Sequence, residues 1–183
     1  MGLDMYLTKK TYVKNWNFEK PEDKKEVIVK IGGKEAKHIK KERISKITED
    51  IGYWRKANAI HTWFVKNVQE GEDNCKEYHV SKEKLEELLK ICETVIKSSI
   101  VIKGKIKNGS HYENGKEVPI IENGKYIKNP LIAKKLLPTE SGFFFGGTDY
   151  DQYYVQNIEE TIKIIKEALK DADTGDFYYQ SNW

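Results

Sequence analysis

Four side chains that can contact a nucleotide fall within eight residues of the block GYWRKANAIHTWFV, at positions 52–65. Trp54 offers an aromatic plane on which a base can stack, and Arg55 offers a guanidinium that pairs with phosphate oxygens. Asn58 and His61 add an amide and an imidazole, which can read the edge of a base or a ribose. We therefore consider these four residues as one side of a ligand pocket.

The same block also has a purely structural interpretation. Its apolar residues recur at helical spacing and predict a helix over 51–69, whose core stripe contains Tyr53, Ala57, Ile60, Phe64 and Val68. At about 100° per residue, Trp54, Asn58 and His61 fall on a second stripe beside the core. There Trp54 could cover the core and His61 could be a hydrogen-bonded structural residue. Because the positions are at an edge, we expect Arg55→Ala or His61→Ala to change stability by no more than ~1 kcal/mol.

A second block, LLPTESGFFFGGTDYDQYY at 136–154, predicts a facing wall. Three phenylalanines between glycines are typical of a short strand, in which Phe143 and Phe145 point to one side and Phe144 to the other. Either all three rings are core, or one side lines a pocket. Ser141 and the flanking glycines would let a ligand approach the backbone. We take Ser141, Phe143 and Phe145 as further candidate ligand-binding residues.

A helix is predicted directly after the phenylalanines. The pattern TDYD at 148–151 places its N-cap at Thr148, and an apolar stripe continues through residue 169. Asp149 and Asp151 would repel a phosphate at this helix start. A divalent cation held by both carboxylates is the alternative, but acids are common at helix starts for dipole reasons alone. We therefore predict neither a phosphate cradle nor a metal site here.

The remaining patterns predict strands and hairpins. Alternation in GLDMYL at 2–7 indicates a half-buried strand, and FYYQSNW at 177–183 indicates a closing strand. A β-branched run broken by Gly-Gly predicts a lysine-rich hairpin at about 26–43. Repeated Asn-Gly turns predict a longer β-ribbon at about 100–130, which is either a mobile surface flap or a lid.

A third helix completes the predicted fold. Residues 82–98 have a strong apolar face, and Ser81 is suited to cap it. We expect an α+β fold with a mainly antiparallel sheet, three main helices and two β-hairpin excursions. The length of 183 residues fits a single domain spanning 1–183.

The amino-acid composition limits the kinds of partner that we expect for this protein. Lys and Arg number 32 against 29 Asp and Glu, and the two signs are interspersed, so we expect no nucleic-acid polymer. Cys75 and Cys92 lack metal-ligand spacing and are expected to be reduced thiols. No apolar run reaches the roughly 18 residues of a membrane span, and the start lacks the regions of a signal peptide. We therefore expect a cytoplasmic protein that does not bind a membrane.

Common catalytic motifs are missing from the sequence. We find no Walker loop, no GxGxxG after a strand, no paired CxxC, no HExxH and no GxSxG. His79 and Ser81 have the spacing of a two-histidine phosphodiesterase motif, but His61 is followed by Trp63 where that motif needs Ser or Thr. We therefore predict no catalytic residues and no cofactor. Whether the protein is an enzyme stays open at this point, and the sequence favours a binding protein.

Several of these blocks resemble a known group of proteins. The segments MGLDMYL, GYWRKANAIHTWFV, EYHVSKEKLEELLKIC, LLPTESGFFFGGTDYDQYY and FYYQSNW resemble a family of small, mostly uncharacterised proteins encoded by bacteriophages and prophages. The match covers most of the chain outside the two predicted hairpins. The resemblance implies a phage origin and a place in the host cytoplasm. Small phage proteins commonly disarm host defence, and some do so by sequestering a nucleotide second messenger.

Three hypotheses follow. The first is a protein that sequesters a small nucleotide-derived immune signal, a cyclic nucleotide or an ADP-ribose derivative, without catalysis. The second is a phosphodiesterase-like enzyme that uses His61 or His79 as acid or base, with Glu140 or Asp149 assisting. The third is an inhibitor that docks its hairpins on a host defence protein. The closing segment FYYQSNW would suit the interface of a homo-oligomer.

Overall fold

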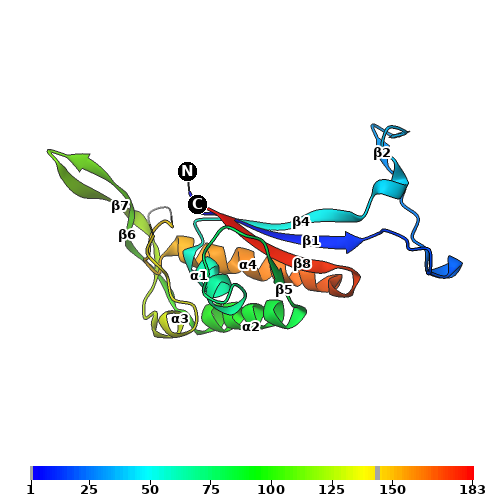
Figure 1. Cartoon of the computed structure of the whole chain (residues 1–183). Coiled ribbons are helices and arrows are strands. Elements are labelled where there is room, and N and C mark those ends of the chain that lie inside the picture. Colours follow the sequence, from blue (N-terminus) through cyan, green and yellow to red (C-terminus); the bar gives the residue numbers. More distant parts are fainter. Residues whose placement is uncertain (1, 143–144) are drawn as a thin grey trace.

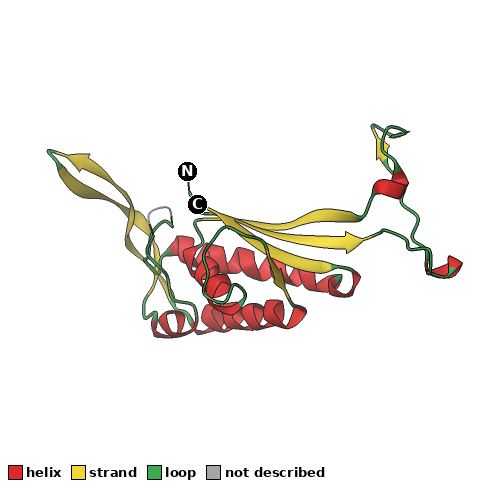
Figure 2. Cartoon of the chain, viewed as in Figure 1, coloured by secondary structure: helices red, strands yellow, loops and turns green. Residues whose placement is uncertain are grey.

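The computed structural model describes residues 2–142 and 145–183. Helices cover one face of a four-stranded antiparallel sheet, as Figures 1 and 2 show. The strand order is β4-β1-β8-β5. Its strands are β1 (Asp4–Tyr12), β4 (Lys46–Arg55), β5 (Tyr78–Val80) and β8 (Asp176–Asn182). The helices are α1 (Asn58–Asn67), α2 (Lys82–Ser98), α3 (Leu131–Leu136) and α4 (Gln152–Lys170). The predicted α+β fold with a mainly antiparallel sheet is confirmed.

The two predicted terminal strands are adjacent in the sheet. Met5 and Leu7 of β1 are fully buried against the helices, as their alternation predicts. In β8 the same alternation buries Phe177 and Tyr179. Because β8 pairs with β1 on one side, and Phe177 to Tyr179 pair with β5 on the other, the first three residues of FYYQSNW do not form a free sheet edge. An oligomer interface at this segment stays a prediction.

Helix α2 begins and ends where the sequence places it. The Ser81 hydroxyl accepts a hydrogen bond from the Lys84 N–H at 3.3 Å, so the predicted cap is confirmed. The apolar face of α2 packs beside α4. The fully buried side chains of this face are Leu85, Leu88, Cys92 and Val95.

The predicted helix over 51–69 is wrong in its first turns. Strand β4 continues to Arg55, and the helix begins only at Asn58. Between them Lys56 has a left-handed backbone, with φ of 57°, and its N–H donates to the Leu3 carbonyl at 2.7 Å. This turn changes the chain direction at a lysine, where a glycine would be the usual signal.

Two predictions in the second block are also wrong. Residues 139–142 and 145–149 are loop, so the described part of the phenylalanine motif contains no strand; residues 143–144 lie outside the described residues. The helix cap is Asp151 instead of Thr148, and α4 starts three residues later than predicted. The Asp151 carboxylate accepts from two backbone N–H groups of the first helical turn, which a threonine hydroxyl does less strongly.

Both predicted hairpin excursions are present. Strands β2 (Lys30–Ile31) and β3 (Lys34–Glu35) flank a Gly-Gly turn, within a long arm that joins β1 to β4. Strands β6 (Val101–Glu113) and β7 (Lys116–Ile127) form the longer ribbon. The arm and the ribbon project from opposite ends of the molecule in Figure 1.

Candidate ligand-binding site

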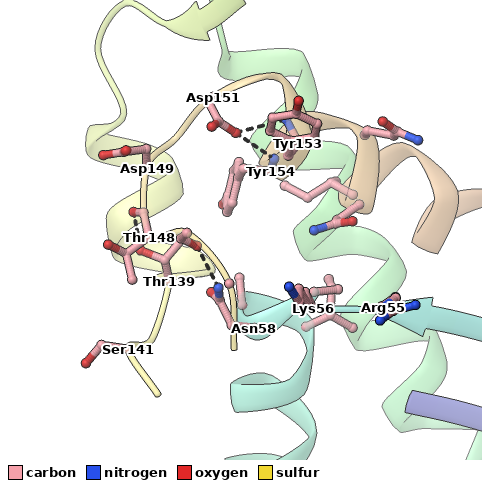
Figure 3. A pocket seen from close by; sticks show the side chains of 18 of the residues that line it. Arg55, Lys56, Asn58, Thr139, Ser141, Thr148, Asp149, Asp151, Tyr153 and Tyr154 are labelled. Atoms are coloured by element: carbon pink, nitrogen blue, oxygen red, sulfur yellow. Dashed lines mark hydrogen bonds between the residues drawn. The ribbon is translucent and has the colours of Figure 1, made fainter. Parts of the chain in front are cut away.

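A cavity of about 970 Å³ opens where the two sequence blocks meet. Its walls come from the end of β4, the first turn of α1, residues 139–142 and 146–149 of the loop that precedes α4, the start of α4 and the middle of β6. The lining mixes polar and apolar groups, and the close view in Figure 3 shows how several of its polar side chains are arranged. Residues that line it include Arg55, Lys56, Asn58, Ser141, Asp149 and Tyr153.

The wall between β4 and α1 is electropositive. Arg55 and Lys56 are exposed there, and neither forms an ion pair with any residue that the structure describes. Ala57 provides no side-chain cap for α1. Within the described chain, the N–H groups of Asn58 and the two residues after it also have no hydrogen-bond acceptor. Such free N–H groups carry partial positive charge, which adds to that of the two side chains.

Asn58 joins this wall to the loop. Its amide nitrogen donates to the carbonyls of Phe145 at 3.0 Å and Gly147 at 2.8 Å. Its amide oxygen accepts from the Glu140 N–H at 3.1 Å. With only 4% of its surface exposed, Asn58 fixes the loop as much as it lines the cavity. The loop backbone therefore forms three hydrogen bonds with this one side chain, two as acceptor and one as donor.

Further bonds brace the loop from within. The Thr139 hydroxyl donates to the Thr148 carbonyl at 2.8 Å, which closes the loop across its neck (Figure 3). The Thr139 N–H donates to the Tyr150 hydroxyl at 3.3 Å. Below them, the buried Tyr154 hydroxyl donates to the Leu137 carbonyl at 2.9 Å. The wall is therefore held in shape before any ligand arrives.

The opposite wall is acidic. Asp149 is exposed, and Asp151 is buried at the start of α4. Burial raises the pKa of Asp151, although the N–H groups of Tyr154 and Tyr153 that it accepts from act in the other direction. Among the described residues, no three His, Cys, Asp or Glu side chains gather as metal ligands. Figure 3 shows the aspartates across the cavity from Lys56 and Arg55.

Three of the predicted ligand-binding residues line the cavity. These are Arg55, Asn58 and Ser141, which come from three different segments. Phe145 lies behind the wall, where its ring packs edge to face with His61 at a centroid distance of 5.0 Å. Phe143 lies outside the described residues.

Trp54 and His61 are placed in the core. Trp54 is 1% exposed, and its indole N–H donates to the Thr161 hydroxyl at 2.9 Å. His61 is equally buried, 2.8 Å from the Tyr179 hydroxyl and 3.0 Å from the Asp73 carboxylate. Both side chains therefore have structural roles, as the second interpretation of this block proposed. The edge position expected for His61 is wrong.

Sequence reasoning missed several lining residues. Lys56 directly follows Arg55, carries the same positive charge and also lines the cavity. Lys107 and Asn108 come from the ribbon, where the sequence KNGS indicated a turn. Tyr53 and Tyr153 also line the cavity and are 50% and 42% exposed, so their rings are accessible. The available signal was the group of three tyrosines in the second block, whereas the first block contains only Tyr53.

Comparisons with known proteins add no independent assignment. No protein-family model, curated protein or solved structure matches this chain. Within the described residues, no helix combines the length and the apolar character that crossing a membrane requires. The functional argument therefore depends on the geometry of the cavity.

Proposed function

We propose that this protein binds and sequesters a small nucleotide-derived ligand without converting it. The observation that carries the proposal is the cavity of about 970 Å³, with cations on one wall and carboxylates on the other. Ligand sites in proteins measure roughly 300–1,000 Å³ and contain a few convergent polar groups. Following the resemblance to phage proteins, we assign this binding to the host cytoplasm, where it would remove an immune signal such as a cyclic nucleotide or an ADP-ribose derivative.

Each part of a nucleotide has a suitable wall. Arg55, Lys56 and the free N–H groups at the start of α1 attract a phosphate. Across the cavity, the carboxylate of Asp149 accepts from ribose hydroxyls or from a base amino group. The exposed rings of Tyr53 and Tyr153 can stack on a base. A ligand with only an anionic group, or only a ring, would use half of these groups.

Sequestration fits the placement of the histidines better than catalysis does. His61 is buried behind the wall, and His79 lies on β5 at the far side of the sheet. Neither is among the described residues that line the cavity. A phosphodiesterase-like enzyme would have to use a carboxylate such as Asp149 in place of either histidine.

The experiment separates binding from turnover. Purified protein is incubated with cyclic dinucleotides and ADP-ribose derivatives, and the filtrate and the heat-denatured protein are then analysed by chromatography. Ligand that leaves the filtrate and returns intact on heating supports sequestration. A changed product would replace it with the enzyme hypothesis, and ligand left in the filtrate would contradict both.

A matched pair of variants tests the site. Arg43 and Arg55 are the two arginines of the chain. Arg43 lies in the arm, at the other end of the molecule from the ribbon. Arg55→Ala should abolish retention, while Arg43→Ala makes the same change of charge and should bind normally. Equal retention by both variants would show that the β4 to α1 wall is not the site.

A second candidate function is docking on another protein, favoured by an exposed aromatic pair in the arm. Trp16 and Phe18 are 51% and 83% exposed and stack at a centroid distance of 6.2 Å. Asn15 holds their loop by two hydrogen bonds with the Lys25 backbone, each 2.8 Å long. Exposed, preorganised aromatics are typical of interaction surfaces.

The positive excess of the chain also lies in the arm. Residues 13–45 contain 10 Lys and Arg against 6 Asp and Glu, whereas the rest of the chain is nearly neutral. An acidic protein surface with an apolar recess would suit this arm. Replacing 14–44 with a two-residue turn should leave ligand retention intact if the cavity is the functional site. Loss of biological effect with intact retention would favour the docking function.

A further inference from the structure

The ribbon contributes to the cavity through an irregularity in β6. The pairing of β6 with β7 shifts between Lys107 and Ser110, so that Asn108 and Gly109 together face Ile120. Gly109 has a left-handed backbone, with φ of 83°. Such bulges bend a strand and redirect its side chains. All four residues from Lys107 to Ser110 line the cavity.

The root of the ribbon is fixed to the body of the protein. The Ile127 N–H donates to the Tyr150 carbonyl at 2.8 Å, and the Lys125 N–H donates to the Gln152 side chain at 3.2 Å. Ile106, directly before the bulge, is 5% exposed. The bulge therefore has a defined position relative to the start of α4, and it is not part of a freely moving flap.

Lys107 is a third cation at the cavity, with surroundings different from those of Arg55 and Lys56. Its ammonium lies 3.7 Å from the Glu117 carboxylate, and both side chains are about half exposed. The Ser110 hydroxyl also donates to Glu117 at 2.5 Å, so this carboxylate keeps a partner if Lys107 turns away. Exposed ion pairs contribute little to the free energy of folding. Lys107 can therefore exchange Glu117 for an anionic ligand.

We infer that the ligand carries two separated anionic groups, one bound at Arg55 and Lys56 and the other at Lys107. This inference depends on the proposed function and specifies its ligand class. The cavity volume lies at the upper end of the range for ligand sites, which is more than a single mononucleotide needs. A dinucleotide with two phosphodiester groups meets both requirements. A nucleotide with one phosphate would leave one cationic end of the cavity empty.

The test compares two adenine ligands that differ in the number of both adenosines and phosphodiesters, so a Lys107 variant is included to isolate the second phosphate. Cyclic AMP has one phosphodiester and cyclic di-AMP has two, and the affinity of each is measured by isothermal titration calorimetry. We expect cyclic di-AMP to bind at least about tenfold more tightly. Lys107→Gln should weaken cyclic di-AMP by about tenfold and leave cyclic AMP unchanged, whereas Arg55→Gln should weaken both.

Lys105→Gln is the matched control. Lys105 is an exposed lysine of the same strand, and it is not among the described lining residues. Deleting Gly109 removes the extra residue from the ladder and should cause the same loss as Lys107→Gln. Equal effects of the Lys105 and Lys107 variants, or equal affinities for the two ligands, would overturn the inference and leave the proposed function standing. If neither ligand binds, the inference is overturned, and the proposed function then depends on whether ADP-ribose derivatives are retained.

Discussion

Replacing Asn58 by alanine should loosen the wall of the cavity and destabilise the whole protein. Asn58 donates to the carbonyls of Phe145 and Gly147 and accepts from the Glu140 N–H. Alanine removes all three hydrogen bonds at once. It keeps the helix, because alanine has the highest helix propensity. The effect of Asn58→Ala therefore comes from the contact between α1 and the loop.

The magnitude follows from these bonds. Each hydrogen bond contributes about 1 kcal/mol net, which gives about 3 kcal/mol for the three. Glu140 is exposed and its N–H can regain a bond to water, which lowers the loss to about 2 kcal/mol. Asn67 at the end of the same helix provides a control, because its amide makes one bond, to the Trp63 carbonyl at 2.8 Å. Asn67→Ala should cost about 1 kcal/mol or less.

Urea denaturation measures both unfolding free energies, and amide hydrogen exchange at Glu140 reports the loop directly. We expect exchange at Glu140 to accelerate in Asn58→Ala and to stay unchanged in Asn67→Ala. If Asn58→Ala costs no more than Asn67→Ala, or if the exchange of Glu140 is the same as in the parent protein, then Asn58 does not hold the loop and the account of this wall is refuted.

Three further predictions test the core, the thiols and the loop backbone. His61→Ala should lower the unfolding free energy by about 2–4 kcal/mol, since it leaves the buried Tyr179 hydroxyl without this partner; a loss below ~1 kcal/mol would restore the edge position expected from the sequence. Burial raises the pKa of the Cys92 thiol to about 12, so a disulfide reagent should modify only the partly exposed Cys75 before unfolding, and rapid reaction of both would contradict this burial. Gly146→Ala should weaken ligand retention, because Gly146 has a left-handed backbone, with φ of 85°, and an added Cβ would lie 3.1 Å from the side chain at the β4 to α1 turn. Retention equal to that of the parent protein would count against this close fit of the loop to the turn.

Regular periodicity explains which elements could be predicted. Helix α2 has a continuous apolar face and a serine directly before it, and both signals are local in sequence. The alternation in β1 is local as well, and so are the Gly-Gly and Asn-Gly turns of the two hairpins. For these segments the residues that determine the structure lie inside the segment.

The junction between β4 and α1 could not be predicted in this way. Trp54 fits both a helical stripe and the inward face of a strand, and its pairing with Met5 decides between them. The position of Gly52 is explained by Ile164 of α4, whose side chain occupies the space that a Cβ would need. Each deciding partner lies far away in sequence, so the local pattern left both interpretations open.

The candidate site could be predicted only in part, again because residues far away in sequence decide which side chains reach the cavity. Arg55 and Ser141 were identified by chemical type, and their exposure suits a binding role. His61 has the right chemistry too, but its partner Tyr179 lies 118 residues away and fixes it in the core. The role of Lys107 depends on the register between β6 and β7, which no single segment specifies.

The bonds of Asn58 have a consequence for how the site should be studied. Asn58 belongs to the first sequence block, and all three of its partners belong to the second, so one amide both lines the cavity and positions its wall. A loss of binding in an Asn58 variant would therefore combine a lost contact with a displaced loop. Arg55 and Lys56 are exposed and form no ion pair within the described chain, so their removal changes the charge of the cavity while the wall stays in place. Affinity changes at these two residues, measured alongside an unchanged unfolding free energy, isolate the electrostatic part of ligand binding.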